Sequence, residues 1–409
     1  SLPPTKQPNR TMESASNKPE TAEPASQNQH DDASLIAAPL TLDKVKQMLE
    51  ACASANEATV QQLVQEHKLY ACQQLPSCGT SPLMVAARGG HVRLCQWLLD
   101  QGAPWNAVDR TNRCAGSHAT DAQQWEVVNL LVEWGTRSEL ILGAMQRQSQ
   151  QHVSQPTPQG PVNQEPSTKP DYISRHKLTY TADGKALLDS DADAVMMEWE
   201  RPIMKAHAQI LMGEQHLGGG KRIMNIGFGM GIIDTIFQEQ YNPSLHIIIE
   251  AHPDVYQKMI KDGWNTKPNV QIYFGRWQDV IPKKLTNLQV DGIFFDTYGE
   301  HVCDMEDFHL LLQGTLSQPH GIYSFFNGLA PDNLFFQGVA CNVIKIQLQK
   351  LGLETEYITC QIEAPNQHEW DGIRRPYWHN RDTYYLPRIT WNQEFLGRKT
   401  AMNDDMDVV

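Results

Sequence analysis

Residues 222–231 read RIMNIGFGMG, and residues 232–240 continue with IIDTIFQEQ. An apolar run typical of a strand leads into Gly227, Gly229 and Gly231, after which apolar residues recur with the period of a helix. Glycines let the backbone turn tightly and approach a ligand closely. A strand, a glycine-rich turn and a helix in this order predict the nucleoside-binding loop of a Rossmann-like domain.

The ligand of this loop is predicted from its glycine spacing and from the next acidic strand end. A dinucleotide-binding loop has the pattern G-x-G-x-x-G, which lets a helix N-terminus face the pyrophosphate. The pattern G-x-G-x-G found here instead suits S-adenosylmethionine (SAM), a cofactor without phosphate. Glu250 ends the following apolar run, where a carboxylate can accept the hydroxyls of a ribose. A solvated strand end is the alternative for Glu250.

Strand and helix patterns alternate through the C-terminal half of the chain. Apolar runs of strand length are separated by helical patterns such as 231–240 and 253–262. This alternation indicates crossover connections and a mostly parallel sheet. The expected fold class is therefore α/β, with an open seven-stranded Rossmann-like sheet within residues 171–396. The predicted strands are 222–226, 245–250, 270–274, 290–295, 321–325 and 353–362, and a final strand pair around 384–389 is expected to complete the sheet.

Residues 39–143 are predicted to form an all-α domain of short helices. The stretch TSPLMVAARGGHVRLCQWLLDQG (80–102) contains a helix with Pro in its first turn, a Gly-Gly break and a second helix ended by Gly102,. LLDQG (98–102) returns as LVEWG (131–135), so Gly102 and Gly135 are separated by the roughly 33-residue period of ankyrin repeats,. Met84 stands where the repeat signature has His. The alternative is an unrelated array of helical hairpins.

The remaining segments lack the apolar residues needed for a core. Residues 1–38 are rich in Ser, Pro, Asn and Gln, and we predict that they are disordered,. Residues 144–170 are rich in Gln and Pro and are predicted to be a linker between the two folded units. Residues 397–409 are predicted to form an acidic tail.

Charge and composition narrow the classes of partner and location. Lys and Arg total 34 against 47 Asp and Glu, a net charge of −13, which disfavours nucleic acid and favours a cationic substrate. No apolar run approaches the roughly 18 residues of a membrane-spanning helix, and no apolar secretory segment is visible. The eight cysteines contain no C-x-x-C pair, which indicates reduced thiols and a location in the cytoplasm, the nucleus or both.

Five segments of the C-terminal half are distinctive: MMEWERPIM (196–204), NIGFGMGIIDT (225–235), IIIEAHPDV (247–255), GRWQDV (275–280) and DGIFFDTYGEH (291–301). They resemble the fungal and plant protein arginine N5-methyltransferases, the type IV or second yeast-type arginine methyltransferases. The catalytic half is also similar to guanidinoacetate N-methyltransferase. The resemblance covers roughly residues 40–395 and implies a SAM-dependent methyltransferase domain preceded by ankyrin-like repeats that recruit a protein substrate, with a ribosomal protein as one candidate.

The resemblance also implies which residues bind the cofactor. Glu250 and its two successors are expected at the ribose, Trp277 and Gln278 at the adenine, and two methionines near the methionine end. Ordinary core packing is the alternative for Trp277 and for the methionines. The full expected cofactor shell is Tyr172, Met196, Met204, Phe228, Gly229, Met230, Gly231, Ile232, Ile233, Glu250, Ala251, His252, Trp277 and Gln278.

Two carboxylates, Glu200 and Asp296, are implied as the catalytic and substrate-binding residues. Asp296 follows four apolar residues at a strand end, where a carboxylate is costly unless it meets a cation. Each carboxylate can accept two hydrogen bonds from the planar donors of a guanidinium. Alternatives are a surface ion pair of Glu200 with Arg201, a helix-capping role for Asp296, and Glu198 in place of Glu200.

The expected reaction moves a methyl group from a sulfonium to nitrogen and needs alignment rather than a metal. If both carboxylates hold the outer NH2 groups, as resemblance implies, the internal N5 nitrogen faces the methyl. Two other functions stay open. One is an ankyrin scaffold with a silent methyltransferase domain, and the other is methylation of a small guanidino compound. Neither the substrate protein nor the oligomeric state is predicted from the sequence.

Overall fold

The computed structural model describes residues 41–152, 172–213, 220–286, 288–298, 302–378 and 381–397. The predictions of disorder for residues 1–38 and of an acidic tail therefore lie almost wholly outside the described residues, as does the linker from residue 153 onward. None of the described helices is long and apolar enough to cross a membrane.

The N-terminal part is all-α, as predicted, with short helices followed by the 28-residue helix α6. Several of these helices start at a capping side chain; in α3, the Ser81 hydroxyl accepts a hydrogen bond of 3.2 Å from the Met84 backbone N–H, and Pro82 occupies the first turn,. The helices enclose one apolar cluster that includes Leu83, Leu98 and Leu131. The elements are α1 (Leu42–Ala53), α2 (Glu57–Glu66), η1 (Lys68–Ala71), α3 (Pro82–Arg88), α4 (Val92–Asp100), α5 (Ala115–Asp121) and α6 (Trp125–His152).

The predicted boundary of the linker is wrong on its N-terminal side. Helix α6 does not end at residue 143 but continues to His152. The added residues include Ala, Met, Arg and Gln, which favour helices, and the first proline follows only at position 156. A Gln-rich composition was therefore compatible with a helix as long as proline was absent.

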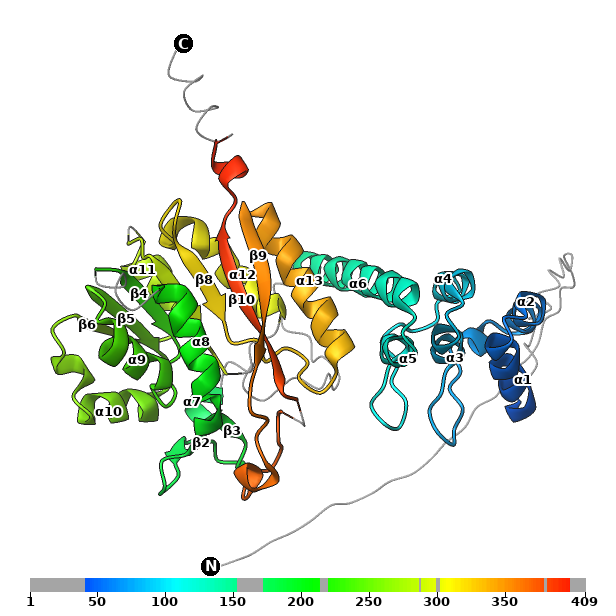
Figure 1. Ribbon diagram of the computed structural model, residues 1–409, viewed down its shortest axis with the longest axis horizontal. Coiled ribbons are helices and arrows are strands. Elements are labelled where there is room, and N and C mark those ends of the chain that lie inside the picture. Colours follow the sequence, from blue (N-terminus) through cyan, green and yellow to red (C-terminus); the bar gives the residue numbers. More distant parts are fainter. Residues whose placement is uncertain are drawn as a thin grey trace, which may run out of the picture. The chain divides into compact units, whose positions relative to one another are not determined.

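The C-terminal part contains the predicted open seven-stranded sheet, with the strand order β6-β5-β4-β7-β8-β10-β9 (Figure 1). Neighbours from β6 to β8 are parallel, whereas β10 pairs antiparallel with both β8 and β9. The sequence order reverses at β4, so the carboxyl ends of β4 and β7 meet at the topological switch point, where ligands of such sheets bind. The strands are β4 (Arg222–Ile226), β5 (Leu245–Glu250), β6 (Val270–Phe274), β7 (Gly292–Phe295), β8 (Ile322–Phe325), β9 (Leu353–Gln361) and β10 (Thr383–Trp391).

Helices cover both faces of this sheet because alternate strand residues point to opposite sides. Met224 and Ile226 pack in one cluster with α11, α12 and α13, while Ile223 packs in another with α8 and α9. These clusters hold the helices against the strands and so position the loops at the carboxyl edge of the sheet. The helical elements are α8 (Arg201–Met212), α9 (Ile232–Ile236), the π-helical η4 (Phe237–Tyr241), α10 (Pro253–Lys261), η5 (Trp264–Thr266), α11 (Trp277–Lys284), α12 (Val302–Thr315), α13 (Leu334–Lys350) and η6 (Gln367–Trp370).

A second, three-stranded antiparallel sheet precedes the main one and was not predicted. It has the order β1-β2-β3, and it follows the short helix α7 (Tyr172–Arg175). Met196 therefore lies on a strand, while Met204 lies on α8. The strands are β1 (Thr179–Tyr180), β2 (Ala186–Leu188) and β3 (Ala194–Met197).

The two predicted folded units share an apolar cluster. Phe335 and Val339 of α13 are buried in the same cluster as the core of the N-terminal helices. The ring of Phe335 fills the space over Gly116 of α5, where an added Cβ atom would lie 2.1 Å from the ring. The N-terminal helices therefore pack directly against the methyltransferase-like part.

Candidate active site between two carboxylates

The glycine-rich loop crosses from β4 to α9 at the carboxyl edge of the sheet. Its three glycines have positive φ angles, +93° at Gly227, +55° at Gly229 and +70° at Gly231, which favour glycine over any residue with a Cβ atom. At Gly227 an added Cβ would lie 2.0 Å from the backbone oxygen of Asp296. The loop therefore brings the ends of β4 and β7 into close contact.

Glu250 ends β5 beside this loop and is buried, so the alternative of a solvated strand end is wrong. Its carboxylate accepts hydrogen bonds from the backbone N–H groups of Phe228 (2.9 Å) and His252 (2.6 Å). Burial raises the pKa of Glu250, and these backbone bonds oppose that rise. A carboxylate has about four lone-pair sites, so Glu250 keeps acceptor capacity for further donors.

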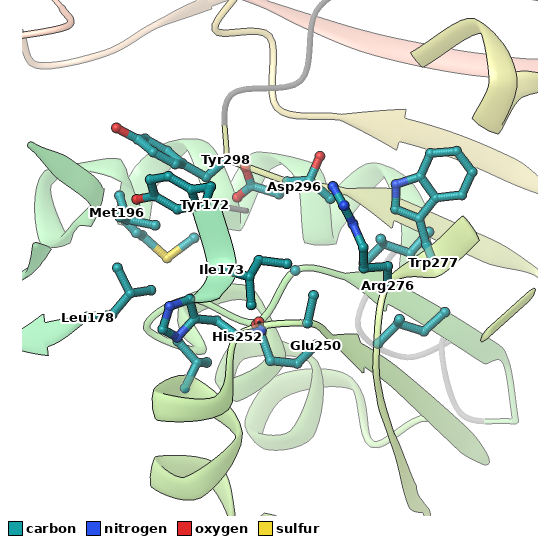
Figure 2. A pocket seen from close by; sticks show the side chains of 18 of the residues that line it. Tyr172, Ile173, Leu178, Met196, Glu250, His252, Arg276, Trp277, Asp296 and Tyr298 are labelled. Atoms are coloured by element: carbon teal, nitrogen blue, oxygen red, sulfur yellow. Dashed lines mark hydrogen bonds between the residues drawn. The ribbon is translucent and has the colours of Figure 1, made fainter. Parts of the chain in front are cut away.

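A cavity of about 190 Å³, here called cavity 1, opens between Glu250 and the end of β7. Figure 2 shows Glu250 and His252 on one side of it and Asp296 with Tyr298 on the other. The structure brings eight of the predicted cofactor residues to its wall: Tyr172, Met196, Gly229, Glu250, Ala251, His252, Trp277 and Gln278.

Six other predicted cofactor residues do not line cavity 1 and instead support the loop. Phe228 packs edge-on against Trp264 at 5.1 Å between ring centroids, and Met230 donates its backbone N–H to the sulfur of Met196 at 3.2 Å. Gly231 supplies the left-handed turn before α9. Met204, Ile232 and Ile233 are buried in one apolar cluster behind the loop. For these three side chains, core packing is the role that the structure shows.

Trp277 lies both at the wall of cavity 1 and in the apolar core. It lines cavity 1, yet its ring also packs edge-on against Phe308 at 5.4 Å. Sequence reasoning missed other wall residues, which come from the α7–β3 region or from positions within the matching segments to which no role was given. The missed residues include Ile173, Leu178, Val195, Arg276, Thr297 and Tyr298.

A second cavity of about 480 Å³, cavity 2, lies on the other side of Asp296. Glu200 lines cavity 2, and Val195, Asp296, Thr297 and Tyr298 line both cavities. The two cavities are thus separated by one short wall that carries a carboxylate. A ligand in cavity 1 and a second ligand in cavity 2 would therefore both lie next to Asp296.

Glu200 is buried at the start of α8 and its carboxylate is fixed by two donors. The backbone N–H of Met197 donates to Oε1 at 2.9 Å, and the hydroxyl of Tyr377 donates to the same oxygen. Burial, together with the negative charge of Asp296, raises the pKa of Glu200 to about 8 despite these bonds. Glu198 instead forms an exposed ion pair with Arg201, so the structure places Glu200, and not Glu198, beside cavity 2.

Asp296 is half-buried, but its Oδ2 atom is buried and has no hydrogen-bond partner among the described residues. Burial, with a contribution from the charge of Asp234, raises the pKa of Asp296 to about 7. Its backbone N–H continues the sheet to Ile226, and no described helix begins there, so the capping alternative is wrong. Within the part of the chain that the structure describes, no Lys or Arg pairs with either carboxylate.

Comparisons with known proteins agree with this fold. Residues 177–335 match the family model of guanidinoacetate N-methyltransferase, and residues 48–140 match that of ankyrin repeats (3 copies). The fold is that of a SAM-dependent methyltransferase domain with N-terminal ankyrin repeats, and its cofactor is SAM.

Three relatives identify the family. All three are named protein arginine N-methyltransferase 2. The Candida glabrata protein is 33% identical, over 76% of this chain and 84% of its own length. The Saccharomyces cerevisiae protein is 31% identical, over 72% and 76%. The Yarrowia lipolytica protein is 43% identical, over 54% of this chain and about half (47%) of its own length. This chain belongs to the protein arginine N-methyltransferase 2 family.

The residues of cavity 1 fit SAM. Glu250 has spare acceptor capacity for ribose hydroxyls, and Gly229 lets a ligand approach the backbone. The apolar side chains of Leu178, Val195 and Met196 suit the uncharged parts of the cofactor. Among the described residues no cluster of three or more His, Cys, Asp or Glu side chains is arranged to hold a metal ion.

Proposed function

We propose that this protein transfers a methyl group from SAM to the internal N5 nitrogen of an arginine in a protein substrate. The observation that carries the proposal is the pair of carboxylates on cavity 2. Glu200 is buried, the Oδ2 atom of Asp296 is buried without a described hydrogen-bond partner, and neither carboxylate has a described cationic partner. An uncompensated buried carboxylate is unfavourable. A guanidinium supplies the missing charge and a planar set of donors at the same time.

The two carboxylates act on the guanidinium in complementary ways. They bind its outer NH2 groups, so that the internal nitrogen points to the wall shared with cavity 1. When SAM is bound, it supplies an electrophilic methyl group on a sulfonium. A nitrogen–carbon bond forms as the carbon–sulfur bond breaks, and the nitrogen then loses one proton. The raised pKa values of Glu200 and Asp296, about 8 and 7, suit a carboxylate that accepts this proton near neutral pH.

The ankyrin repeats are proposed to recruit the protein substrate, because such repeats present extended binding surfaces. Methylation of a small guanidino compound is the second candidate, and the match of residues 177–335 to the guanidinoacetate methyltransferase family favours it. A small metabolite would not need a recruiting domain.

Fragment-ion mass spectrometry of the methylated product tests the proposal. The purified protein and SAM are incubated with an arginine-containing protein extract and, separately, with guanidinoacetate. We expect methyl groups on N5 of protein arginine. Glu200→Gln and Asp296→Asn should each slow transfer by roughly 30-fold to several thousand-fold, the equivalent of about 2–5 kcal/mol, while the dissociation constant for SAM changes little.

Glu198→Gln is the matched control, since it removes an exposed carboxylate two residues away. It should retain wild-type turnover. Methyl groups on the outer nitrogens would contradict the N5 assignment, and faster turnover of guanidinoacetate would favour the second candidate. Full activity of both the Glu200 and the Asp296 variants would refute the carboxylate pair.

A further inference from the structure

One wall of cavity 2 is a loop that contains a residue, Ala330, in an unfavourable backbone conformation. Residues 328–332, between β8 and α13, line this cavity. Within the loop, Ala330 has a φ of +42°, in the left-handed region that residues with a Cβ atom rarely adopt. Such a conformation persists only where the surrounding structure holds it in place. The shape of cavity 2 therefore depends on what anchors this loop.

The methyltransferase domain anchors the first part of the loop. The backbone N–H of Asn327 donates to the Tyr384 hydroxyl at 2.6 Å, and the Arg381 guanidinium donates to the Pro331 carbonyl at 2.7 Å. Both partners belong to the segment that leads into and forms β10. These contacts hold the loop against the main sheet.

The ankyrin repeats hold the end of the loop. The side-chain nitrogen of Asn333 donates to the backbone oxygen of Asn112 at 3.0 Å, while the side-chain oxygen caps α13 by accepting from Phe335 and Phe336. Phe335 follows directly and is buried in the ankyrin core against Gly116. Asn333 and Phe335 thus contact the repeats one and three residues after Asp332, which lines cavity 2.

We propose that the ankyrin repeats shape cavity 2, by holding the 327–333 loop through Asn333 and Phe335, and so position the substrate in addition to recruiting it. The nature of that substrate rests on the proposed function, whereas the anchoring of the loop does not. Recruitment alone would require only an accessible surface on the repeats. It would not require Phe335, three residues beyond the wall of the substrate cavity, to lie inside the core of the repeats.

The substitution Gly116→Ala tests this from the ankyrin side. An added Cβ would collide with the Phe335 ring at 2.1 Å, so α13 and the loop must shift. The matched control is Gly338→Ala, a helical glycine of α13 itself, where a Cβ meets nothing within 4 Å. Three measurements are made on the full chain: amide hydrogen exchange of residues 326–337, turnover of a short arginine peptide, and titration with SAM.

In Gly116→Ala we expect exchange in residues 326–337 to accelerate at least tenfold and the KM for the short peptide to rise at least fivefold. The dissociation constant for SAM should stay within twofold, and Gly338→Ala should match the wild type throughout. Wild-type exchange and peptide KM in Gly116→Ala, even with lost turnover of a protein substrate, would overturn the inference in favour of recruitment alone.

A second variant covers the case in which Gly116→Ala unfolds the repeats. Asn333→Asp keeps the oxygen that caps α13 but loses the donor to Asn112, and it should accelerate exchange of the loop in the same direction. Unchanged exchange in Asn333→Asp would also count against the inference. If the wild type methylates no arginine compound, the proposed function fails, while the exchange measurements still decide whether the repeats hold the loop.

Discussion

At the scale of single residues, Glu200 and Asp296 make the stability of the protein depend on pH. Their folded-state pKa values, about 8 and 7, lie above the ordinary values of 4.5 and 3.8. The folded state therefore binds more protons than the unfolded state between about pH 4 and 8. Stability falls as pH rises through this window.

Because stability falls as pH rises, variants that replace either carboxylate with an uncharged amide should be more stable than the wild type at high pH. Glu200→Gln and Asp296→Asn should each melt several degrees above the wild type at pH 8, because they remove a charge that is costly to bury. The difference should shrink toward pH 5, where the wild-type carboxyls are protonated. Calorimetric scans at both pH values measure it. If either variant is less stable than the wild type at pH 8, the carboxylate it lacks must already be compensated by a positive charge in the folded protein.

Tyr377 is a positioning residue for Glu200. Its hydroxyl donates to Oε1, and this bond lowers the pKa of Glu200 against the effect of burial. In Tyr377→Phe the pKa of Glu200 should rise further, so the acid limb of the kcat/KM profile moves to higher pH. Activity at pH 7 should fall by roughly 10- to 100-fold, the size of a lost hydrogen bond to a charged group, and recover partly at pH 9.

Tyr357→Phe is the control for this profile. The Tyr357 hydroxyl donates to the Cys341 carbonyl at 3.0 Å and lines neither cavity. It should leave the profile in place. A uniform loss of activity in Tyr377→Phe without a shift along the pH axis would mean that Tyr377 only stabilises the fold.

At the scale of elements, the contact between β4 and β7 is the most demanding feature of the site. Gly227→Ala should destabilise the protein by about 3 kcal/mol or more, because it adds both a positive-φ strain and a collision with the Asp296 carbonyl. Gly184→Ala provides the matched comparison. Gly184 also has a positive φ, +70°, but has open space around its Cβ position, so only the strain of roughly 1–2 kcal/mol applies.

Denaturant titration of both variants separates the two effects. SAM titration should show weaker binding in Gly227→Ala alone, since its loop lines cavity 1. Equal losses of stability in Gly227→Ala and Gly184→Ala would mean that the collision with the Asp296 carbonyl costs little, because the ends of β4 and β7 move apart easily.

Elements with a strong local pattern could be predicted from the sequence, and those defined by distant partners could not. The parallel strands are continuous apolar runs, so their positions were predicted to within one or two residues. The hairpin β1-β2-β3 has strands of two to four residues, too short for a periodic pattern. Its contribution to cavity 1 was therefore not predicted.

The same distinction holds for the site. Glu250 and Asp296 end apolar strands, and strand ends at a switch point are identifiable from the sequence. Glu198 and Glu200 could not be separated, because both lie in one 3-10 turn and only the packing of Tyr377 and Arg201 distinguishes them. Met204, Ile232 and Ile233 were expected at the cofactor from the family resemblance. The sequence could not show that their side chains face an apolar cluster behind the loop, because that depends on how α8 and α9 pack on the sheet,.

At the scale of the whole molecule, the shared core should couple the two halves thermodynamically. SAM at 100 times its dissociation constant stabilises the state that binds it by about 2.7 kcal/mol. If the halves unfold together, slow amide exchange in α5 should decrease by roughly the same 100-fold factor as exchange in β4. Hydrogen-exchange mass spectrometry with and without SAM measures both. Protection confined to the methyltransferase domain would show that the ankyrin repeats open independently.

The insertion of Phe335 into the ankyrin core also bears on how the protein is made. During synthesis the repeats leave the ribosome first, but the side chain that completes their core lies far downstream in the sequence. At roughly 5–20 residues per second, the nascent repeats wait on the order of tens of seconds with an apolar opening at Gly116. During that interval the apolar surface around Gly116 stays exposed to solvent, and it is covered only when α13 has emerged.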